Sequence, residues 1–211
     1  MRKVIAIDGP AGSGKGTIAR ELASYFKFKY IDTGMLYRVV AYLKQTPDFL
    51  KNFTLQKLLD ARKKISDKEL RSPENSQRTS LVSQNLEIRN LITKMVQDHI
   101  DNSEDGFVLD GRDIGTVVAP DAFCKIFLTA DSEVRAYRRF VQQSKSDPNL
   151  TLEKVLENIN LRDHQDMTRD VAPLRYDESY IKVDTSGKAV KQSMKECLNI
   201  VKNAMQKNLE S

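Results

Sequence analysis

Short runs of apolar residues alternate along the chain with longer segments in which apolar residues recur every three or four positions. The short runs predict strands at Val4–Asp8, Tyr30–Asp32, Gly106–Asp110, Cys124–Leu128 and Tyr180–Val183. The longer segments predict helices over residues 16–26, 35–43, 73–84, 86–100, 131–143, 151–169 and 188–207. Strands flanked by helices favour an α/β fold in which a parallel sheet is covered by helices on both faces.

Residues 46–72 interrupt this alternation. The segment is polar and rich in lysine, and only residues 55–65 show a weak helical pattern. We expect a helical, lysine-rich linker here rather than strands.

Length and composition limit the class of protein. A chain of 211 residues can bury one sizeable core, and 40% hydrophobic with 30% charged residues is typical of a soluble globular domain. No apolar run approaches the roughly 18 residues that span a membrane, and the first strand begins too early to leave room for a signal peptide. Cys124 and Cys197 are far apart, which argues against a zinc site and against a secreted disulfide scaffold. We expect one domain, in the reducing cytoplasm.

The net charge of +5, from 34 basic and 29 acidic residues, suits an anionic partner, and it is also compatible with weak nonspecific binding of nucleic acid. Arginines gather at particular points: Arg112, Arg135, Arg138, Arg139, Arg162, Arg169 and Arg175. This preference favours bidentate contacts with phosphate over a diffuse basic surface.

A glycine-rich loop follows the first strand directly. It consists of Gly9, Pro10, Ala11, Gly12, Ser13, Gly14, Lys15, Gly16 and Thr17. Glycines allow a tight turn with inward N–H groups, Lys15 can reach the β and γ phosphates, and the start of the next helix adds partial positive charge. The usual pattern has Ser or Thr directly after the lysine, whereas here Gly16 stands there and Thr17 follows. An ordinary glycine turn is the alternative, but the flanking strand and helix favour a phosphate-binding loop.

A second motif, Asp110–Asp113, follows the third predicted strand. Asp110 could meet magnesium through water. Arg112 and Asp113 would project at the carboxyl end of the strand, where ligands bind in open α/β sheets. The alternative is a surface turn, because Asp-Gly is common in turns.

Other candidates lie on predicted helices. Arg38 could point back toward the strand ends and bind phosphate, or it could be a solvated helix residue. Arg162, Asp166 and Arg169 share one helical face, which suits either a site or a solvated ladder of ion pairs.

Arg138 and Arg139 precede a loop that contains Pro148. They could form a mobile arm over a substrate, or they could be plain surface charge.

Taken together, these motifs resemble those of the bacterial cytidylate kinases, small P-loop nucleoside monophosphate (NMP) kinases, over the whole chain. The resemblance rests on residues 7–17, 32–38 and 110–118, on 125–130, on Arg162, Asp163, Asp166 and Arg169, and on 171–174. Residues 110–118 and 171–174 are much more specific than the glycine loop. The resemblance implies a core of residues 1–38, 85–130 and 175–211, an NMP-binding region at about 39–84, and a helical lid at about 131–170.

The resemblance also implies an activity and its residues: transfer of the γ-phosphoryl group of ATP to CMP or dCMP, with Mg²⁺ held through phosphates and water. Lys15, Arg112, Arg138, Arg139 and Arg169 would be catalytic, with Arg138 and Arg139 on the lid near the transferring phosphates. Thr33, Arg38, Arg112 and Arg169 would hold the acceptor phosphate, Ser80, Arg89 and Asp113 would meet the cytosine, and Arg162 and Asp166 would touch the sugar. The expected protein is a monomer that binds neither nucleic acid nor membrane.

One departure and two alternatives remain. Longer members of the family carry a small β-stranded insert, which residues 46–72 replace, and this puts in doubt how tightly CMP closes its site. A UMP, thymidylate or small-metabolite kinase is one alternative. A nucleotide-switched or nucleic-acid-binding P-loop protein is the other, although the sequence has no Asn-Lys-x-Asp guanine signature and no recognised nucleic-acid motif.

Overall fold

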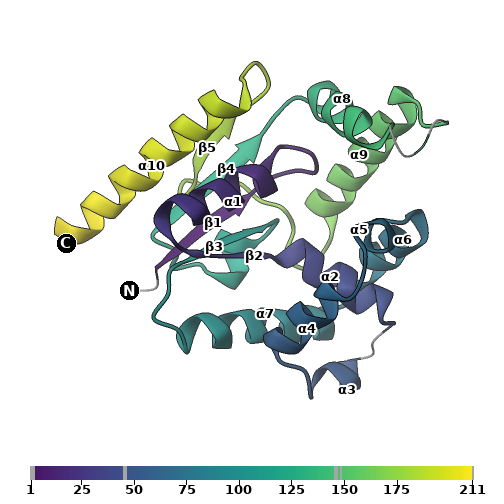
Figure 1. Cartoon of the computed structure of the whole chain (residues 1–211), viewed down its shortest axis with the longest axis horizontal. Coiled ribbons are helices and arrows are strands. Elements are labelled where there is room, and N and C mark those ends of the chain that lie inside the picture. The colour runs from purple at the N-terminus through teal and green to yellow at the C-terminus, as the bar shows by residue number, and fades with distance from the viewer. Residues whose placement is uncertain (1–2, 45–46, 145–146, 148, 211) are drawn as a thin grey trace. The chain divides into compact units, whose positions relative to one another are not determined.

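A parallel sheet with helices packed against it is the centre of the structure, a computed structural model that describes residues 3–44, 47–144, 147 and 149–210. The strands are β1 (Val4–Asp8), β2 (Lys29–Asp32), β3 (Phe107–Gly111), β4 (Cys124–Thr129) and β5 (Ile181–Asp184), in the spatial order β2-β3-β1-β4-β5 (Figure 1). β1 runs parallel to both β3 and β4, and β4 runs parallel to β5. The predicted α/β class, the parallel sheet and the five strands are confirmed.

The helices are α1 (Lys15–Phe26), α2 (Thr33–Tyr42), α3 (Pro47–Leu50), α4 (Leu55–Lys63), α5 (Asp67–Leu70), α6 (Pro73–Val82), α7 (Leu86–Asp101), α8 (Ser132–Gln143), α9 (Leu152–Thr168) and α10 (Val190–Glu210), with a short π-helix, η1 (Ile114–Val118). Every helix that the apolar pattern predicts is present. Among the described residues, no helix combines the length and the apolar character that crossing a membrane requires.

The chain forms two compact units, which we call the sheet unit (Met1–Tyr30 with Gly106–Ser211) and the helical unit (Ile31–Asp105). Residues 31–38 and 85–105, which the resemblance assigns to the core, belong to the helical unit, and the division into core, NMP-binding region and lid stays a prediction. The roles expected for residues 39–84 and 131–170 stay predictions.

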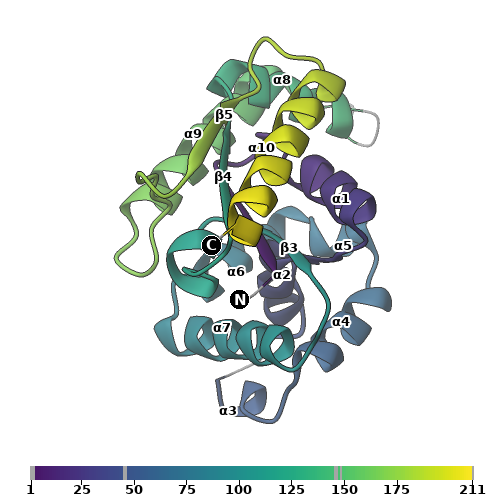
Figure 2. The ribbon, with the colours of Figure 1, turned by 90° about the vertical axis from the view of Figure 1, so that its left-hand side faces the viewer.

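The core of the sheet unit lies under two helices. Ile18 and Leu22 of α1 and Val201 of α10 pack together with Ile5 and Ile126 of the central strands. Figures 1 and 2 show α1 and α10 side by side along this face of the sheet. Side chains alternate between the faces of a strand, so the neighbouring residue Phe127 lies on the opposite face, where it packs with Leu174 and Tyr180.

Helices α8 and α9 form a separate pair within the sheet unit and lie beside each other in Figure 1. They pack against each other through a small cluster of Ala136, Val155 and Ile159, which is separate from the core under α1 and α10. This pair carries most of the arginines of the predicted lid.

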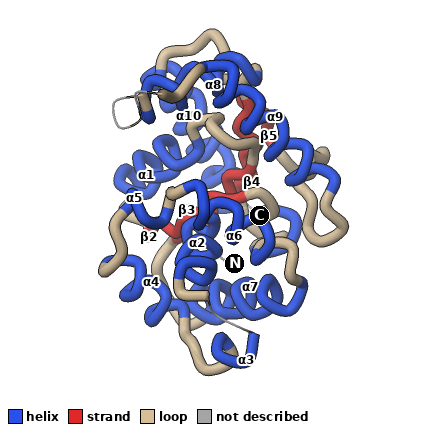
Figure 3. Tube along the Cα trace, turned by 90° about the vertical axis from the view of Figure 1, so that its right-hand side faces the viewer, coloured by secondary structure: helices blue, strands red, loops and turns tan. Residues whose placement is uncertain are grey.

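The helical unit corrects one expectation. Residues 47–70 are helical as expected, in α3, α4 and α5, but they pack into the unit rather than forming a linker, and Figure 3 shows this unit as helices joined by loops. Leu50, Leu55, Leu58 and Leu70 are buried, and α3, α4 and α5 pack on α2 or α7. The expected absence of a β-stranded insert holds for the described residues 47–72, none of which lies in a strand.

Candidate active site

The glycine loop has the backbone conformation that only glycine adopts easily. Gly9, Gly12 and Gly14 have φ of +148°, +77° and +94°. A Cβ atom on Gly9 would lie 2.0 Å from the Leu128 carbonyl oxygen of β4, so a side chain cannot fit there. The loop therefore closes tightly between the end of β1 and the start of α1, as the sequence predicts.

The start of α1 is open to an anion. Gly14, which precedes the helix, has no side chain that could accept a hydrogen bond from the first N–H groups of α1. Ser13 Oγ is buried and has no hydrogen-bond partner among the residues that the structure describes. A phosphate oxygen suits both features, because it can accept from the N–H groups and from the hydroxyl. This loop thus fits a polyphosphate chain.

Lys15 is buried inside the loop rather than extended into solvent. Its Nζ donates to the Pro10 carbonyl oxygen at 2.8 Å. Burial, assisted by the positive charge of Arg112, lowers the pKa of Lys15 to about 7, although Asp110 and Asp8 oppose the shift. A negatively charged ligand beside the ammonium group would favour its charged form.

Three of the predicted arginines converge on one carboxylate within the sheet unit. Arg112 Nε donates to Asp166 Oδ2 at 2.8 Å, Arg169 Nη1 lies 3.7 Å from Asp166 Oδ1, and Arg162 Nε lies 4.0 Å from Asp166 Oδ2. The side chains of Arg112, Arg169 and Asp166 are 17%, 7% and 14% exposed, so this is not a solvated ladder. Three cations around one anion leave a local excess of positive charge, which can attract a phosphate.

The pKa values of the cluster reflect this arrangement. Burial alone would lower the pKa of Arg112, but Asp166 and the more distant Asp110 and Asp163 outweigh it and raise that pKa. Burial alone would raise the pKa of Asp166, but Arg112, Arg162 and Arg169 hold it below the usual range. Arg112 and Asp166 therefore both stay ionised at neutral pH.

Asp110 lies next to the position that a P-loop hydroxyl usually occupies. A Cβ on Gly16 would be 3.2 Å from Asp110 Oδ2, and this carboxylate accepts a hydrogen bond from the Tyr30 hydroxyl at 3.0 Å. Magnesium in phosphate-transfer sites is commonly bound by one or two carboxylates together with phosphate oxygens. Asp110 therefore has the chemistry and the position to contribute to a magnesium site beside the loop.

Arg138 is anchored rather than free. Its guanidinium donates to the hydroxyl and the carbonyl oxygen of Thr185, at 2.9 and 2.6 Å. The Thr185 hydroxyl lies 3.1 Å from the Thr129 carbonyl oxygen and 3.4 Å from the Ser13 carbonyl oxygen of the glycine loop, either of which can accept its one proton. Thr185 thus lies between Arg138 and the glycine loop, and Arg139, the neighbour of Arg138 on α8, is half-buried.

The remaining predicted residues lie in the helical unit. Arg38 is buried, and its Nη1 donates to the Leu70 carbonyl oxygen at 2.9 Å and to Ser76 Oγ at 3.1 Å, so it is not a solvated helix residue. Arg89 is also buried, donates to the Ser83 carbonyl oxygen at 2.9 Å and stacks over the ring of Tyr37.

Thr33 is buried at the first position of α2, and Ser80 lies half-buried on α6. Thr33, Arg38, Ser80 and Arg89 are the residues predicted to bind the acceptor nucleotide that lie in the helical unit.

One residue was missed from the sequence. Asp8 is fully buried at the end of β1, where it accepts from the backbone N–H groups of Ile114 and Gly115, at 2.9 and 2.8 Å, and from the Tyr180 hydroxyl at 2.7 Å. Burial raises the pKa of Asp8, although these hydrogen bonds oppose the shift. Asp8 thus fixes the π-helix η1, which starts directly after the buried Asp113. An acidic residue at the end of an otherwise apolar strand was the available signal.

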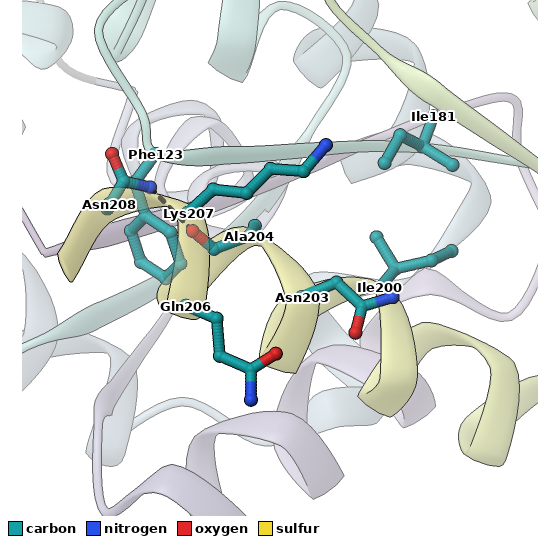
Figure 4. Close-up of a pocket in the computed structure, with 8 residues that line it drawn as sticks. All are labelled: Phe123, Ile181, Ile200, Asn203, Ala204, Gln206, Lys207 and Asn208. Atoms are coloured by element: carbon teal, nitrogen blue, oxygen red, sulfur yellow. Dashed lines mark hydrogen bonds between the residues drawn. The ribbon is translucent and has the colours of Figure 1, made fainter. Parts of the chain in front are cut away.

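An open hollow of about 490 Å³ lies elsewhere in the sheet unit. Phe123, Ile181 and the last turns of α10 line it, as Figure 4 shows. Phe123 precedes β4 and Ile181 begins β5, so the hollow is at the amino ends of the strands, whereas the glycine loop follows a carboxyl end. No predicted site residue is among the described residues that line it.

The sheet order, the glycine loop after β1 and the buried lysine define a P-loop kinase fold. The crystal structure of shikimate kinase from Bacteroides thetaiotaomicron shares this fold, with a TM-score of 0.53 and 10% identity over 96% of this chain and 98% of that one.

Sequence comparison then gives the family. The model of the family described as cytidylate kinase matches residues 5–203. A protein named cytidylate kinase from Thermosipho melanesiensis is 39% identical, covering 94% of this chain and 96% of its own length. Another protein of that name, from Fervidobacterium nodosum, is also 39% identical, over 96% and 97%. The chain belongs to the cytidylate kinase family and is therefore a nucleoside monophosphate kinase.

Proposed function

We propose that this chain transfers the γ-phosphoryl group of ATP to CMP or dCMP, giving ADP and CDP or dCDP. The observation that carries the proposal is the convergence of Arg112, Arg162 and Arg169 on Asp166, in a cluster whose arginines also influence the buried Lys15. The glycine loop with Lys15 suits the polyphosphate of a donor, and the arginine cluster around Asp166 suits the phosphate of an acceptor. Membership of the cytidylate kinase family supports the choice of CMP.

The reaction needs no general base. The second pKa of a phosphate monoester is about 6, so the attacking oxygen of CMP is mostly deprotonated at neutral pH. That oxygen forms a bond to the γ-phosphorus while the bond to the β–γ bridging oxygen breaks, and ADP leaves with the electron pair. Catalysis then depends on positioning and on neutralising the charge of the transferring group.

We assign the donor side to the glycine loop. Gly9 to Thr17 would hold the phosphates through backbone N–H groups, and Lys15 would reach the β and γ phosphates. Arg138 and Arg139 would neutralise the transferring group from α8. Magnesium, which in such enzymes neutralises charge on the β and γ oxygens, would be held by phosphates and water beside Asp110.

We assign the acceptor side from the family resemblance. Arg112, Arg169, Thr33 and Arg38 would bind the phosphate. Ser80, Arg89 and Asp113 would meet the cytosine, and Arg162 and Asp166 the sugar. A carboxylate at Asp113 can accept from the N4 amino group of cytosine, whereas uracil presents an acceptor there. Closure of residues 131–170 would keep water from the γ-phosphate. A cytoplasmic location and a monomeric state stay predictions.

The test of this function is ADP formation from ATP with each nucleoside monophosphate in turn. We expect CMP and dCMP to be the best acceptors and Lys15→Ala to remove the activity. A preference for UMP, thymidylate or a small metabolite would show that the proposed substrate is wrong. Tight, strongly salt-dependent binding of a polynucleotide without ADP formation would show that the proposed enzymatic function is wrong.

The base assignment has its own test. We expect Asp113→Asn to narrow the ratio of kcat/KM between CMP and UMP, which a mismatched buried polar group can set at about 10⁴ or more. Asp98→Asn, which removes an exposed carboxylate on α7, is the matched control and should leave the ratio unchanged. An unchanged ratio in Asp113→Asn would show that Asp113 does not read the base.

A further inference from the structure

Two consecutive peptide groups of the glycine loop are held by side chains from outside the loop. The N–H group of Ala11 donates to Asp163 Oδ1 at 3.2 Å, and the carbonyl oxygen of Ala11 accepts from Arg135 Nη1 at 3.0 Å. Arg135 Nη1 also donates to Asp163 Oδ2 at 2.5 Å, which closes a ring of contacts around Ala11. Arg135 comes from α8 and Asp163 from α9, so both helices contact the loop at Ala11.

This ring is buried. Ala11, Arg135 and Asp163 are 3%, 6% and 7% exposed. Arg135 Nε also donates to the Ala130 carbonyl oxygen at 2.7 Å, just after β4, so the guanidinium is fixed on two sides. A buried ion pair usually adds little net stability compared with apolar side chains of similar size. Its specific effect here is geometric, because it sets the orientation of the loop backbone.

That orientation bears directly on Lys15. The peptide group whose N–H donates to Asp163 is formed by Pro10 and Ala11, and its carbonyl oxygen accepts from Lys15 Nζ at 2.8 Å. Because a peptide group is planar, fixing its N–H also fixes the direction of its carbonyl oxygen. By holding the Pro10–Ala11 peptide group, Asp163 therefore fixes the carbonyl oxygen to which the Lys15 ammonium group donates.

The next glycine depends on the same contact. Gly12 has φ of +77°, and a Cβ there would lie 3.2 Å from Arg135 Cβ and 3.3 Å from the Arg135 carbonyl oxygen. The backbone of α8 thus packs closely on the loop at Gly12, and the loop cannot shift toward α8. Helix α9 also carries Arg162 and Asp166, and Arg169 follows its last residue, so the same helix contributes to the loop contact and to the arginine cluster.

We infer that Arg135 and Asp163 are positioning residues, which hold the Ala11 peptide groups so that the loop and Lys15 are ready for the phosphates of the nucleotide donor. The inference deepens the proposed function and rests on it only in assigning the donor to this loop. It predicts a defect in ATP binding that is separable from CMP binding.

The experiment compares Asp163→Asn and Arg135→Lys with the wild type in steady-state kinetics. We expect KM for ATP to rise by at least about tenfold, the effect of losing one charge-assisted hydrogen bond, while KM for CMP changes less than about twofold on the same scale. Glu157→Gln, on the exposed side of α9, is the control and should resemble the wild type. Unchanged KM values for both substrates, or equal increases in both, would overturn the inference.

A paired variant separates positioning from folding. Arg135→Met together with Asp163→Leu removes both charges, so no buried charge is left unpaired and the fold should be kept. We expect this variant to melt near the wild-type temperature but still to show the raised KM for ATP. Recovery of the wild-type KM by the apolar pair would overturn the inference.

A final measurement distinguishes the inference from the proposed function. The rise in melting temperature on adding ATP alone does not depend on the acceptor, and we expect it to shrink in Asp163→Asn. If the wild type fails to phosphorylate CMP but ATP raises the melting temperature of Asp163→Asn less than that of the wild type, the proposed substrate is wrong and the positioning role stands. If ATP stabilises the variant as much as the wild type, the positioning role is wrong.

Discussion

Replacing Asp166 by Asn would remove the one carboxylate that the structure places among Arg112, Arg162 and Arg169 in the sheet unit. Their nitrogens lie 2.8, 4.0 and 3.7 Å from its oxygens, and Asp166 is only 14% exposed. The substitution keeps the size of the side chain and changes its charge. The guanidinium groups would then repel one another with no carboxylate at this position to offset the repulsion.

The size of the effect follows from these distances. At an effective dielectric constant of about 20, two unit charges 4 Å apart interact by about 4 kcal/mol, and the Arg112 contact is closer than that. The cost of desolvation offsets much of this attraction, and removing one partner of a buried pair typically destabilises a protein by about 3–5 kcal/mol. For a chain of 211 residues, this corresponds to a fall in Tm of about 6–20 °C.

The pH dependence of this loss has a definite sign. The arginines outweigh burial and lower the pKa of Asp166 in the folded state. A lowered pKa contributes stability above the unfolded value of about 3.9 and loses it as the pH falls through the folded value. The difference in Tm between the wild type and Asp166→Asn should therefore have its full size at pH 7. It should shrink below about pH 4, where Asp166 of the wild type becomes protonated.

The assay is thermal unfolding with and without inorganic phosphate at pH 7. A phosphate dianion can replace the lost negative charge, so we expect it to raise the Tm of Asp166→Asn more than that of the wild type. Asp170→Asn, which removes an exposed carboxylate just beyond α9, is the matched control and should show neither effect. Equal stabilisation of all three proteins by phosphate would refute the view that this cluster is an anion site.

Two further predictions concern the glycine loop. Because burial lowers the pKa of Lys15 to about 7, ATP binding at pH 8 should take up protons, which calorimetry in buffers of different ionisation enthalpy can measure. Lys15→Arg, which is always charged, should take up none, and equal uptake by both proteins would contradict the assignment. Gly9→Ala would place Cβ 2.0 Å from the Leu128 carbonyl oxygen at φ of +148°. Strain and overpacking in Gly9→Ala should lower the free energy of unfolding, measured in urea, by about 2–6 kcal/mol. Gly187→Ala, whose Cβ meets nothing within 4 Å, is the control. Similar stability of the two variants would contradict the tight loop.

The regular elements could be predicted because their signals are local. The apolar run before the glycine loop is β1 at the predicted bounds, Val4–Asp8, and the helix predicted over residues 86–100 is α7, Leu86–Asp101. Turn residues and helix caps near the boundaries supply the rest of the signal, as with Asn85, which caps α7 through the Ile88 N–H.

Residues 46–72 show where local signals fail. The helices α3 and α5 are only four residues long, too short for a helical period to stand out from the surrounding lysines. Leu50 and Leu70 are nevertheless fully buried, because neighbouring helices of the same unit cover them. The π-helix η1 escaped prediction for a related reason, since its first N–H groups are held by Asp8, 106 and 107 residues away in the chain.

The amino-acid sequence by itself determined the phosphate loop, the alternation of strands and helices, and the supply of arginines that marks a phosphate-handling protein. These depend on residue types at short spacing, which act through local backbone preference. Only the tertiary structure decided which charges meet: Asp166 with Arg112, 54 positions apart, and Asp163 with Ala11, 152 positions apart. Such contacts arise because α9, packed on α8 within the sheet unit, brings Asp163 to the glycine loop and Asp166 to Arg112, where these side chains are largely buried.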